Sequence, residues 1–277
     1  MTIYTIIPMA IGIVVALFGM SKQKQGATWG QPLAILGAII AIGSALWNVV
    51  GQATGGNSNA IADREQRYMF LQGKFLGQEI KKAVPATKKV VVLVDAMSKF
   101  DVYGEPLAEP REDYSLKGLK DALGAGVDVV TVCQTIPKRK PQMQKMPDGS
   151  EVEMPMMPTD FITGKDLKGL EKDIKGADVF VALSMLPMDL TLPQCLGLLQ
   201  GTGAEVALLN PGADIDTLKK VFADGGKNTA EVIAAVMTKK SAIYDDKIPS
   251  NDQAAFDRRY VLVSKNGYEA ALDAADK

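Results

Sequence analysis

Histidine is absent from this sequence of 277 residues, and its absence narrows the chemistry open to the protein. Histidine is the side chain most often used for proton transfer near neutral pH, and it is the commonest ligand of catalytic zinc. Ser-His-Asp and Cys-His catalysis are therefore excluded. Cysteine is nearly absent too, because Cys133 and Cys195 are the only two. They fall in a predicted strand and a predicted helix, so we expect free buried thiols rather than a disulfide.

The sequence also lacks an excess of positive charge and a glycine-rich phosphate loop. Its 31 basic residues are balanced by 32 acidic ones, so no surplus positive field attracts nucleic acid. The first predicted strand runs on into DAMSKFDVYG (95–104), and neither GxGxxG nor GxxxxGKS/T follows any predicted strand. We therefore expect no nucleic-acid binding, no nucleotide site of these kinds and no cofactor.

Two long apolar runs lie near the N-terminus. Residues 3–20 and 32–50 carry no charged side chain, and each run is about long enough to cross a hydrocarbon core of roughly 30 Å. Either run alone would also suit a buried core helix, but two runs joined by a short polar loop favour a membrane. Small residues recur from Ala34 to Ala45 at spacings that let a second helix approach closely. We predict that residues 1–51 form a transmembrane helical hairpin in a lipid bilayer.

The charges beside the two runs predict an orientation. Lys22 and Lys24 lie in the connecting loop, whereas residues 51–62 carry no charge. Because positive loops stay on the cytoplasmic side, we expect the rest of the chain to be extracytoplasmic, or periplasmic. Residues 52–87 are predicted as a flexible linker over Gly51–Asn59, followed by a juxtamembrane helix from Ala60 to about Val84.

Short β-branched runs alternate with amphipathic helical patterns over residues 88–277. The predicted strands are 89–95, 127–133, 178–184, 205–210, 231–237 and 260–264, of which 231–237 is ambiguous. The predicted helices are 114–123, 167–174, 192–199, 215–223, 252–259 and 268–275. Strands that are apolar throughout, each followed by a helix, are typical of a mainly parallel sheet covered on both faces. The predicted fold class is therefore α/β, with a doubly wound, Rossmann-like soluble domain.

Part of this pattern resembles a known family. The segments KKVVVLVD, GLKDALGAGVDVVTV, GADVFVALSMLP and GAEVALLNPGAD resemble the lobes of type I periplasmic-binding proteins, in which strand ends line a ligand cleft. The resemblance covers most of residues 88–277. This chain has strands for about one lobe, whereas that family has two. No bound sugar or amino acid and no binding residue is therefore carried over.

The residues at the ends of the predicted strands are the candidate ligand site. Ligands of open parallel sheets lie outside the carboxyl ends of the strands. The candidates there are Asp95, Ser98, Thr135, Ser184 and Asn210. Asp95 could contact a ligand hydroxyl, amine or metal, or it could cap a turn. Asp214 opens a predicted helix whose amides could hold an anion, but a helix cap is favoured.

The segment 137–158 interrupts the alternation with prolines and five methionines, which are Met143, Met146, Met154, Met156 and Met157. Thioether sulfur is a soft ligand that could bind Cu(I), but methionine is also a flexible apolar side chain suited to contacts with other proteins. Prolines disfavour regular structure. We predict an irregular, partner-binding loop without a metal.

These observations support three hypotheses. The leading one is a membrane-anchored, non-enzymatic binding or scaffolding protein that belongs to a membrane-associated or self-assembled complex. The second is a membrane-tethered sensor or receptor with a small molecule at the strand ends around Asp95 and Ser184. The third is a hydrolase or transferase based on aspartate, for which Asp95 with Asp101 is the nearest candidate pair.

Overall fold

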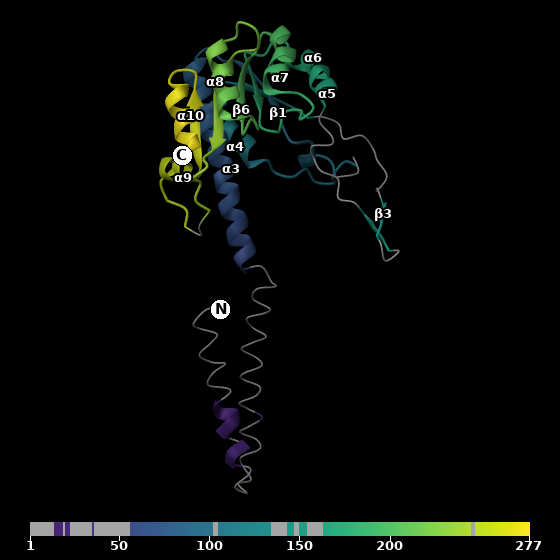
Figure 1. The fold of residues 1–277 in the computed structure, drawn as a ribbon, viewed down its shortest axis with the longest axis vertical. Helices are drawn as coiled ribbons and strands as arrows, with labels where there is room; N and C mark the ends of the chain where they lie inside the picture. Colours follow the sequence, from purple (N-terminus) through teal and green to yellow (C-terminus); the bar gives the residue numbers. More distant parts are fainter. Residues whose placement is uncertain are drawn as a thin grey trace. The chain divides into compact units, whose positions relative to one another are not determined.

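The computed structural model describes residues 14–18, 20–22, 35, 56–101, 105–133, 143–146, 150–153, 163–244 and 247–277. The chain divides into two compact units, Met1–Arg64 and Glu65–Lys277. The second unit is a mixed α/β fold around a six-stranded, mostly parallel sheet (Figure 1).

The sheet confirms the predicted strands. They are β1 (Lys89–Leu93), β2 (Asp128–Val132), β5 (Val179–Ala182), β6 (Glu205–Leu209), β7 (Val232–Thr238) and β8 (Tyr260–Ser264). Their order is β2-β1-β5-β6-β7-β8, and every neighbouring pair is parallel except β7 and β8. The ambiguous segment 231–237 is thus a strand, and its burial explains why it carries an unbroken apolar run.

Most of the helices from residue 56 onward begin and end close to the predicted positions. The helices are α3 (Gly56–Ala83), α4 (Tyr114–Leu123), α5 (Gly164–Gly169), α6 (Glu171–Ile174), α7 (Leu192–Leu199), α8 (Ile215–Asp224), α9 (Asp252–Arg259) and α10 (Tyr268–Asp276). Asp214 caps α8 by accepting a hydrogen bond from the N–H of Thr217 at 2.8 Å, so the cap interpretation is confirmed.

Two helix predictions need correction. The segment 167–174 is not one helix, because α5 and α6 meet at Leu170. The linker prediction is wrong for residues 56–59, where α3 has already begun. Extending an existing helix costs far less than starting one, so weak helix formers can be included at its end. Residues 51–55 lie outside the described part of the chain.

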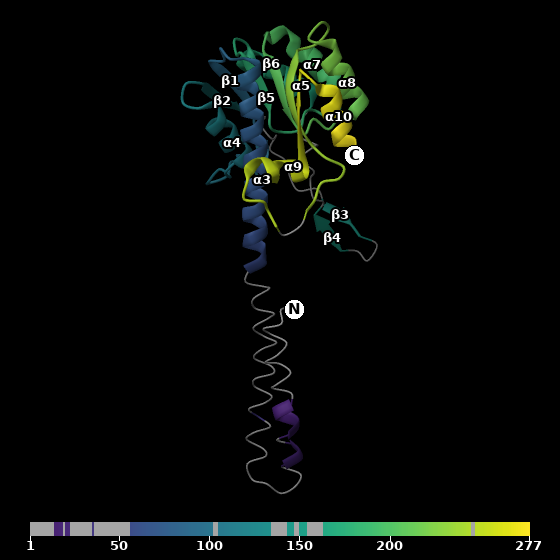
Figure 2. The same ribbon diagram turned by 90° about the vertical axis from the view of Figure 1, so that its left-hand side faces the viewer.

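The helices cover both faces of the sheet. Helices α3, α4 and α9 pack on one face, where Leu76, Leu119 and Phe256 are buried against the strands. Helices α5, α6, α7, α8 and α10 pack on the other face (Figure 2). This arrangement is compatible with the doubly wound, Rossmann-like expectation, and it explains why the strands are apolar on both sides.

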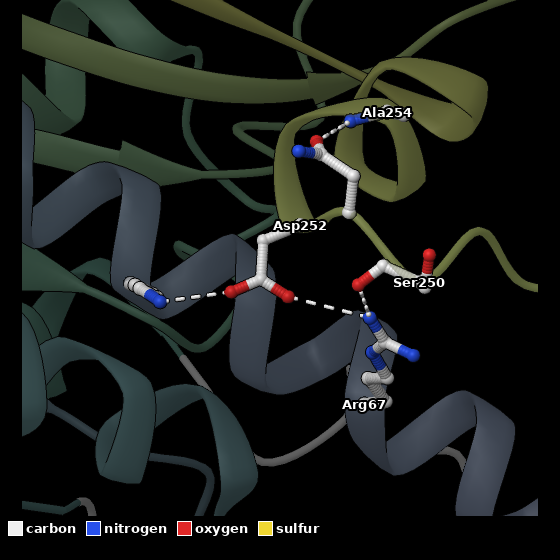
Figure 3. A network of polar contacts seen from close by, with 6 residues as sticks. Arg67, Ser250, Asp252 and Ala254 are labelled. Atoms are coloured by element: carbon white, nitrogen blue, oxygen red, sulfur yellow. Dashed lines mark hydrogen bonds and ion pairs between the residues drawn. The ribbon is translucent and has the colours of Figure 1, made fainter.

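A polar network docks α3 onto the start of α9 (Figure 3). Arg67 donates to the carbonyl oxygen of Ser250 at 2.9 Å and to the carboxylate of Asp252 at 3.3 Å. Lys74, about two turns further along α3, donates to the other oxygen of Asp252 at 2.8 Å. One carboxylate at the N-terminus of α9 therefore binds two cations of α3.

The segment 137–158 contains regular structure, which corrects the prediction of an irregular loop. Strands β3 (Met143–Lys145) and β4 (Glu151–Glu153) pair in an antiparallel hairpin, separate from the main sheet. Every proline of the segment lies outside these two strands, and the turn-forming sequence PDG separates them. Met146 is exposed, while Met154, Met156 and Met157 lie outside the described residues.

Within the described residues, no helix is both long and apolar enough to cross a membrane. Most of the two predicted spans, 3–20 and 32–50, falls outside that part of the chain. Residues 14–18 and 20 of the first span are helical. The membrane hairpin therefore stays a prediction from the sequence.

Asp178, just before β5, is expected to make the fold sensitive to acid. Its carboxylate accepts hydrogen bonds from the backbone N–H groups of Lys88 and Lys89 at 2.7 and 2.8 Å, and these bonds hold its pKa below the usual value. A lowered folded-state pKa stabilises the fold above the unfolded-state pKa of about 3.9, and this contribution is lost as the pH falls through the folded-state pKa. Asp178→Asn is thus expected to lower the urea midpoint at neutral pH but not in strong acid. An equal fall in the urea midpoint at both pH values would contradict this prediction. So would the same pH dependence of the midpoint in the surface variant Asp121→Asn.

Candidate ligand-binding site

The chain changes direction at the centre of the sheet, between β1 and β5. These strands are parallel neighbours, yet the chain leaves β1 towards β2 on one side and leaves β5 towards β6 on the other. The connecting helices α4 and α7 lie on opposite faces of the sheet. Such a switch point opens a crevice outside the carboxyl ends of the two strands, where open α/β sheets bind ligands.

A cavity of about 280 Å³ occupies this position, and we name it the switch-point cavity. Its walls come from the ends of β1, β5 and β6 and from the neighbouring helices α3 and α4. The lining residues are Met69, Gln72, Asp95, Asp113, Ser115, Leu183, Ser184, Met185, Leu186, Met188, Leu209 and Asn210. A mostly apolar wall with a few converging polar groups is typical of small-molecule sites.

The structure brings together part of the predicted site. Asp95, Ser184 and Asn210 all line the switch-point cavity. Ser98 does not line it, because its hydroxyl donates to the carbonyl oxygen of Asp95 at 2.6 Å and completes a helical turn. Thr135 lies outside the described residues.

Three polar residues of the cavity were missed from the sequence. Gln72 on α3 and Ser115 on α4 sit within amphipathic helices, where nothing distinguishes them from surface residues. Asp113 precedes α4 and carries only the signal of a helix cap. The packing of α3 and α4 over the strand ends is what assigns these residues to the site.

Three largely buried polar side chains line the cavity. Ser115 is 3% exposed, Gln72 is 6% exposed and Ser184 is 9% exposed. None of these three side chains forms a hydrogen bond to a residue within the described part of the chain. Within the described residues, the one fully buried side-chain polar atom without a partner is Oε2 of Glu205, so the polar atoms of Gln72, Ser115 and Ser184 are not of that kind. They line the cavity and offer donors and acceptors to a molecule in it.

Two carboxylates line the same cavity. Asp95 accepts a hydrogen bond from the N–H of Met97 at 2.9 Å, and Asp113 accepts one from the N–H of Leu116 at 3.0 Å. The cap interpretation of Asp95 is thus confirmed, but each cap uses only one of the two carboxylate oxygens. Among the described residues that line the cavity, none is basic. The described lining therefore carries two carboxylates and no basic side chain.

The backbone at Asn210 is unusual. Its φ of 46° is the only positive φ outside glycine among the described residues. The residue before a proline is disfavoured in helical conformations, and Pro211 follows directly. The hydroxyl of Thr238 donates to the Asn210 side chain at 3.1 Å and helps to hold it. Backbone conformations of this kind cluster at ligand sites.

A second cavity of about 280 Å³ adjoins the first. It lies between the segment after β5 and the N-terminus of α8, and it shares Met185, Leu186, Met188 and Asn210 with the switch-point cavity. Cys195 lines it as a free, buried thiol, and burial raises the pKa of this thiol to about 11. Cys133 is also free but only half-buried. Cys195 therefore stays protonated at neutral pH and is a poor nucleophile.

The carboxylate pair of the third hypothesis is not assembled at this cavity. Asp101 does not line it, and its carboxylate accepts the N–H of Glu105 at 2.9 Å. Across the described ranges, no three metal-ligating side chains come together.

The fold and the cavity place this chain among α/β proteins with a mostly parallel sheet and a ligand-sized cavity at its switch point. Comparisons with protein-family models, with curated proteins and with solved structures found no match to the chain. The resemblance to periplasmic-binding lobes accordingly stays a prediction.

Proposed function

We propose that this protein is a membrane-anchored binding protein whose Rossmann-like domain binds a small molecule in the switch-point cavity. The observation that carries the proposal is the group of three largely buried polar side chains that line the cavity, Gln72, Ser115 and Ser184. Each offers a hydrogen-bonding group to a molecule in the cavity. The position of the cavity at the strand ends points to the same role.

The anchor half of the proposal rests on the sequence. Residues 3–20 and 32–50 have the length and the absence of charge of membrane spans. A membrane receptor or sensor needs a binding domain and a membrane anchor. The α/β domain and residues 1–51 would supply them. A scaffolding role for segment 137–158 has no comparable support from the described residues and stays a prediction.

A thermal shift experiment with a blocked cavity tests the binding half. A ligand that binds only the folded protein at about 100 times its Kd stabilises it by about 2.7 kcal/mol. We expect one or more members of a metabolite panel to raise the Tm of the full chain in detergent by several degrees, and Met185→Trp to abolish the rise. Ile243→Trp is the matched control, because Ile243 is as exposed as Met185 but does not line the cavity.

Two outcomes contradict the proposal. If no panel member raises the Tm, or if the shift survives in Met185→Trp, the cavity is not the binding site. The anchor is tested separately by ultracentrifugation: a full chain that stays dispersed in buffer without detergent is not anchored through residues 1–51.

A further inference from the structure

The polar lining of the switch-point cavity is negative or neutral at every described position. Asp95 and Asp113 supply two carboxylates, while no lysine or arginine of the described residues lines the cavity to balance them. Asp95 is exposed and Asp113 is half-buried, and carboxylates of this kind attract cations and repel anions. We infer that the ligand is an organic cation, a small molecule with an ammonium group and an apolar body. This inference rests on the proposed function, since it specifies the ligand of that site.

The geometry of the two carboxylates suits an ammonium group. A backbone N–H bonds one oxygen of Asp95, and another bonds one oxygen of Asp113, so each carboxylate is oriented by the helical turn that it caps. The second oxygen of each has no hydrogen bond to a described residue and remains an acceptor. An ammonium group has three N–H donors and no acceptor, which matches a set of carboxylate, hydroxyl and amide oxygens.

The apolar part of the ligand would contact methionine side chains. Met69, Met185 and Met188 line the cavity and are 42%, 49% and 64% exposed. Methionine side chains are flexible and polarisable, so they adapt to apolar groups of different shape. Three exposed methionines around one cavity are expected to close over the uncharged part of a ligand, while Ser115 and Ser184 contact its polar end.

Other ligand classes fit less well. A phosphate or carboxylate ligand needs basic side chains or free amides, and the described lining offers carboxylates instead. No three His, Cys, Asp or Glu side chains come together within the described ranges, so a metal ion with several protein ligands of these types has no site here. A neutral sugar would satisfy the hydroxyl and amide groups but would leave both carboxylates without a cation.

Three probes of one shape and different charge test the inference. Phenethylamine, 2-phenylethanol and phenylacetate are cationic, neutral and anionic at neutral pH. We expect calorimetry on the full chain in detergent to give an affinity for the amine at least about tenfold above that for the alcohol, which corresponds to one modest ion pair. Phenylacetate is expected to bind most weakly of the three.

The double variant Asp95→Asn, Asp113→Asn removes the charge but keeps both helix caps, because asparagine caps helices as well as aspartate. We expect this variant to bind phenethylamine at least about tenfold more weakly. Its affinity for 2-phenylethanol is expected to be nearly unchanged. The matched control is Asp121→Asn, Asp128→Asn, which removes the same charge from positions that do not line the cavity.

Equal affinities for the three probes, no binding of phenethylamine, or an unchanged amine affinity in the cavity variant would each overturn the inference. Other results would contradict the proposed function. If a neutral or anionic panel member binds and Met185→Trp blocks it, the binding site stands and the cationic ligand is wrong. If no panel member depends on the cavity, both are wrong.

Discussion

Gly118→Ala is expected to lower the free energy of unfolding by about 3 kcal/mol, the upper part of the range for overpacking a well-packed contact. Helices α3 and α4 cross at glycines. A Cβ atom on Gly118 would lie 1.9 Å from the carbonyl oxygen of Phe70, and one on Gly73 would lie 1.8 Å from the carbonyl oxygen of Ser115. Both obstacles are backbone atoms, so no side chain can rotate away. The helices must separate, which exposes apolar surface packed between them.

The same substitution in an open place gives the control. Gly197 lies on the exposed side of α7, and a Cβ atom there meets nothing within 4 Å. Gly197→Ala is expected to raise stability by about 0.5 to 1 kcal/mol, because alanine loses less backbone entropy in a helix. Urea unfolding of both variants of the full chain in detergent measures the contrast. If Gly118→Ala is as stable as Gly197→Ala, the helices do not touch at these glycines.

The crossing also has a functional consequence. Gln72 precedes Gly73 on α3, and Ser115 is one turn before Gly118 on α4. The glycines therefore bring the two helices close enough to place both polar side chains on one cavity. A Gly118→Ala protein that remains folded is expected to lose the ligand-induced thermal shift as well.

Local patterns made most of the α/β fold predictable. Residues 114–123, 252–259 and 260–264 have the bounds predicted from the sequence, because caps and apolar spacing act within a few residues. Strand-end residues were also predictable in part, since Asp95 and Ser184 follow neighbouring parallel strands. Any parallel sheet gathers such residues at one edge.

Contacts between distant segments were not predictable in the same way. Gln72 lines the cavity only because α3 packs on α4. Gly73 and Gly118 lie within helical patterns, and the sequence alone does not indicate that the two helices cross there. The hairpin of β3 and β4 was not predicted, because each strand is only three residues long and prolines flank both. Only the first of these misses comes from a neighbour that lies far away in the sequence, because the two strands of the hairpin are close together in the chain.

Arg259, the last residue of α9, joins three segments in the second unit. Its guanidinium bonds both carboxylate oxygens of Glu65 on α3, at 2.6 and 3.1 Å. It also lies 3.6 Å from the ring centroid of Tyr68 and 4.5 Å from that of Tyr244. The side chain is only 1% exposed, whereas Glu65 is 43% exposed. A buried cation held by two rings and a bidentate carboxylate fixes α3 against α9 and against the segment that contains Tyr244.

Arg259→Ala is therefore expected to lower the free energy of unfolding by about 3 to 4 kcal/mol, because it leaves a cavity and removes both cation–π contacts. Arg259→Lys keeps the charge but loses the planar bidentate contact and the stacking, so we expect it to recover only a small part of the loss. Lys240→Ala, which breaks an exposed ion pair with Asp276, is expected to change the urea midpoint little. Urea unfolding of the full chain in detergent compares the three variants. If Arg259→Lys is as stable as the parent, charge alone accounts for this contact, and the rings of Tyr68 and Tyr244 contribute nothing to the docking of α3.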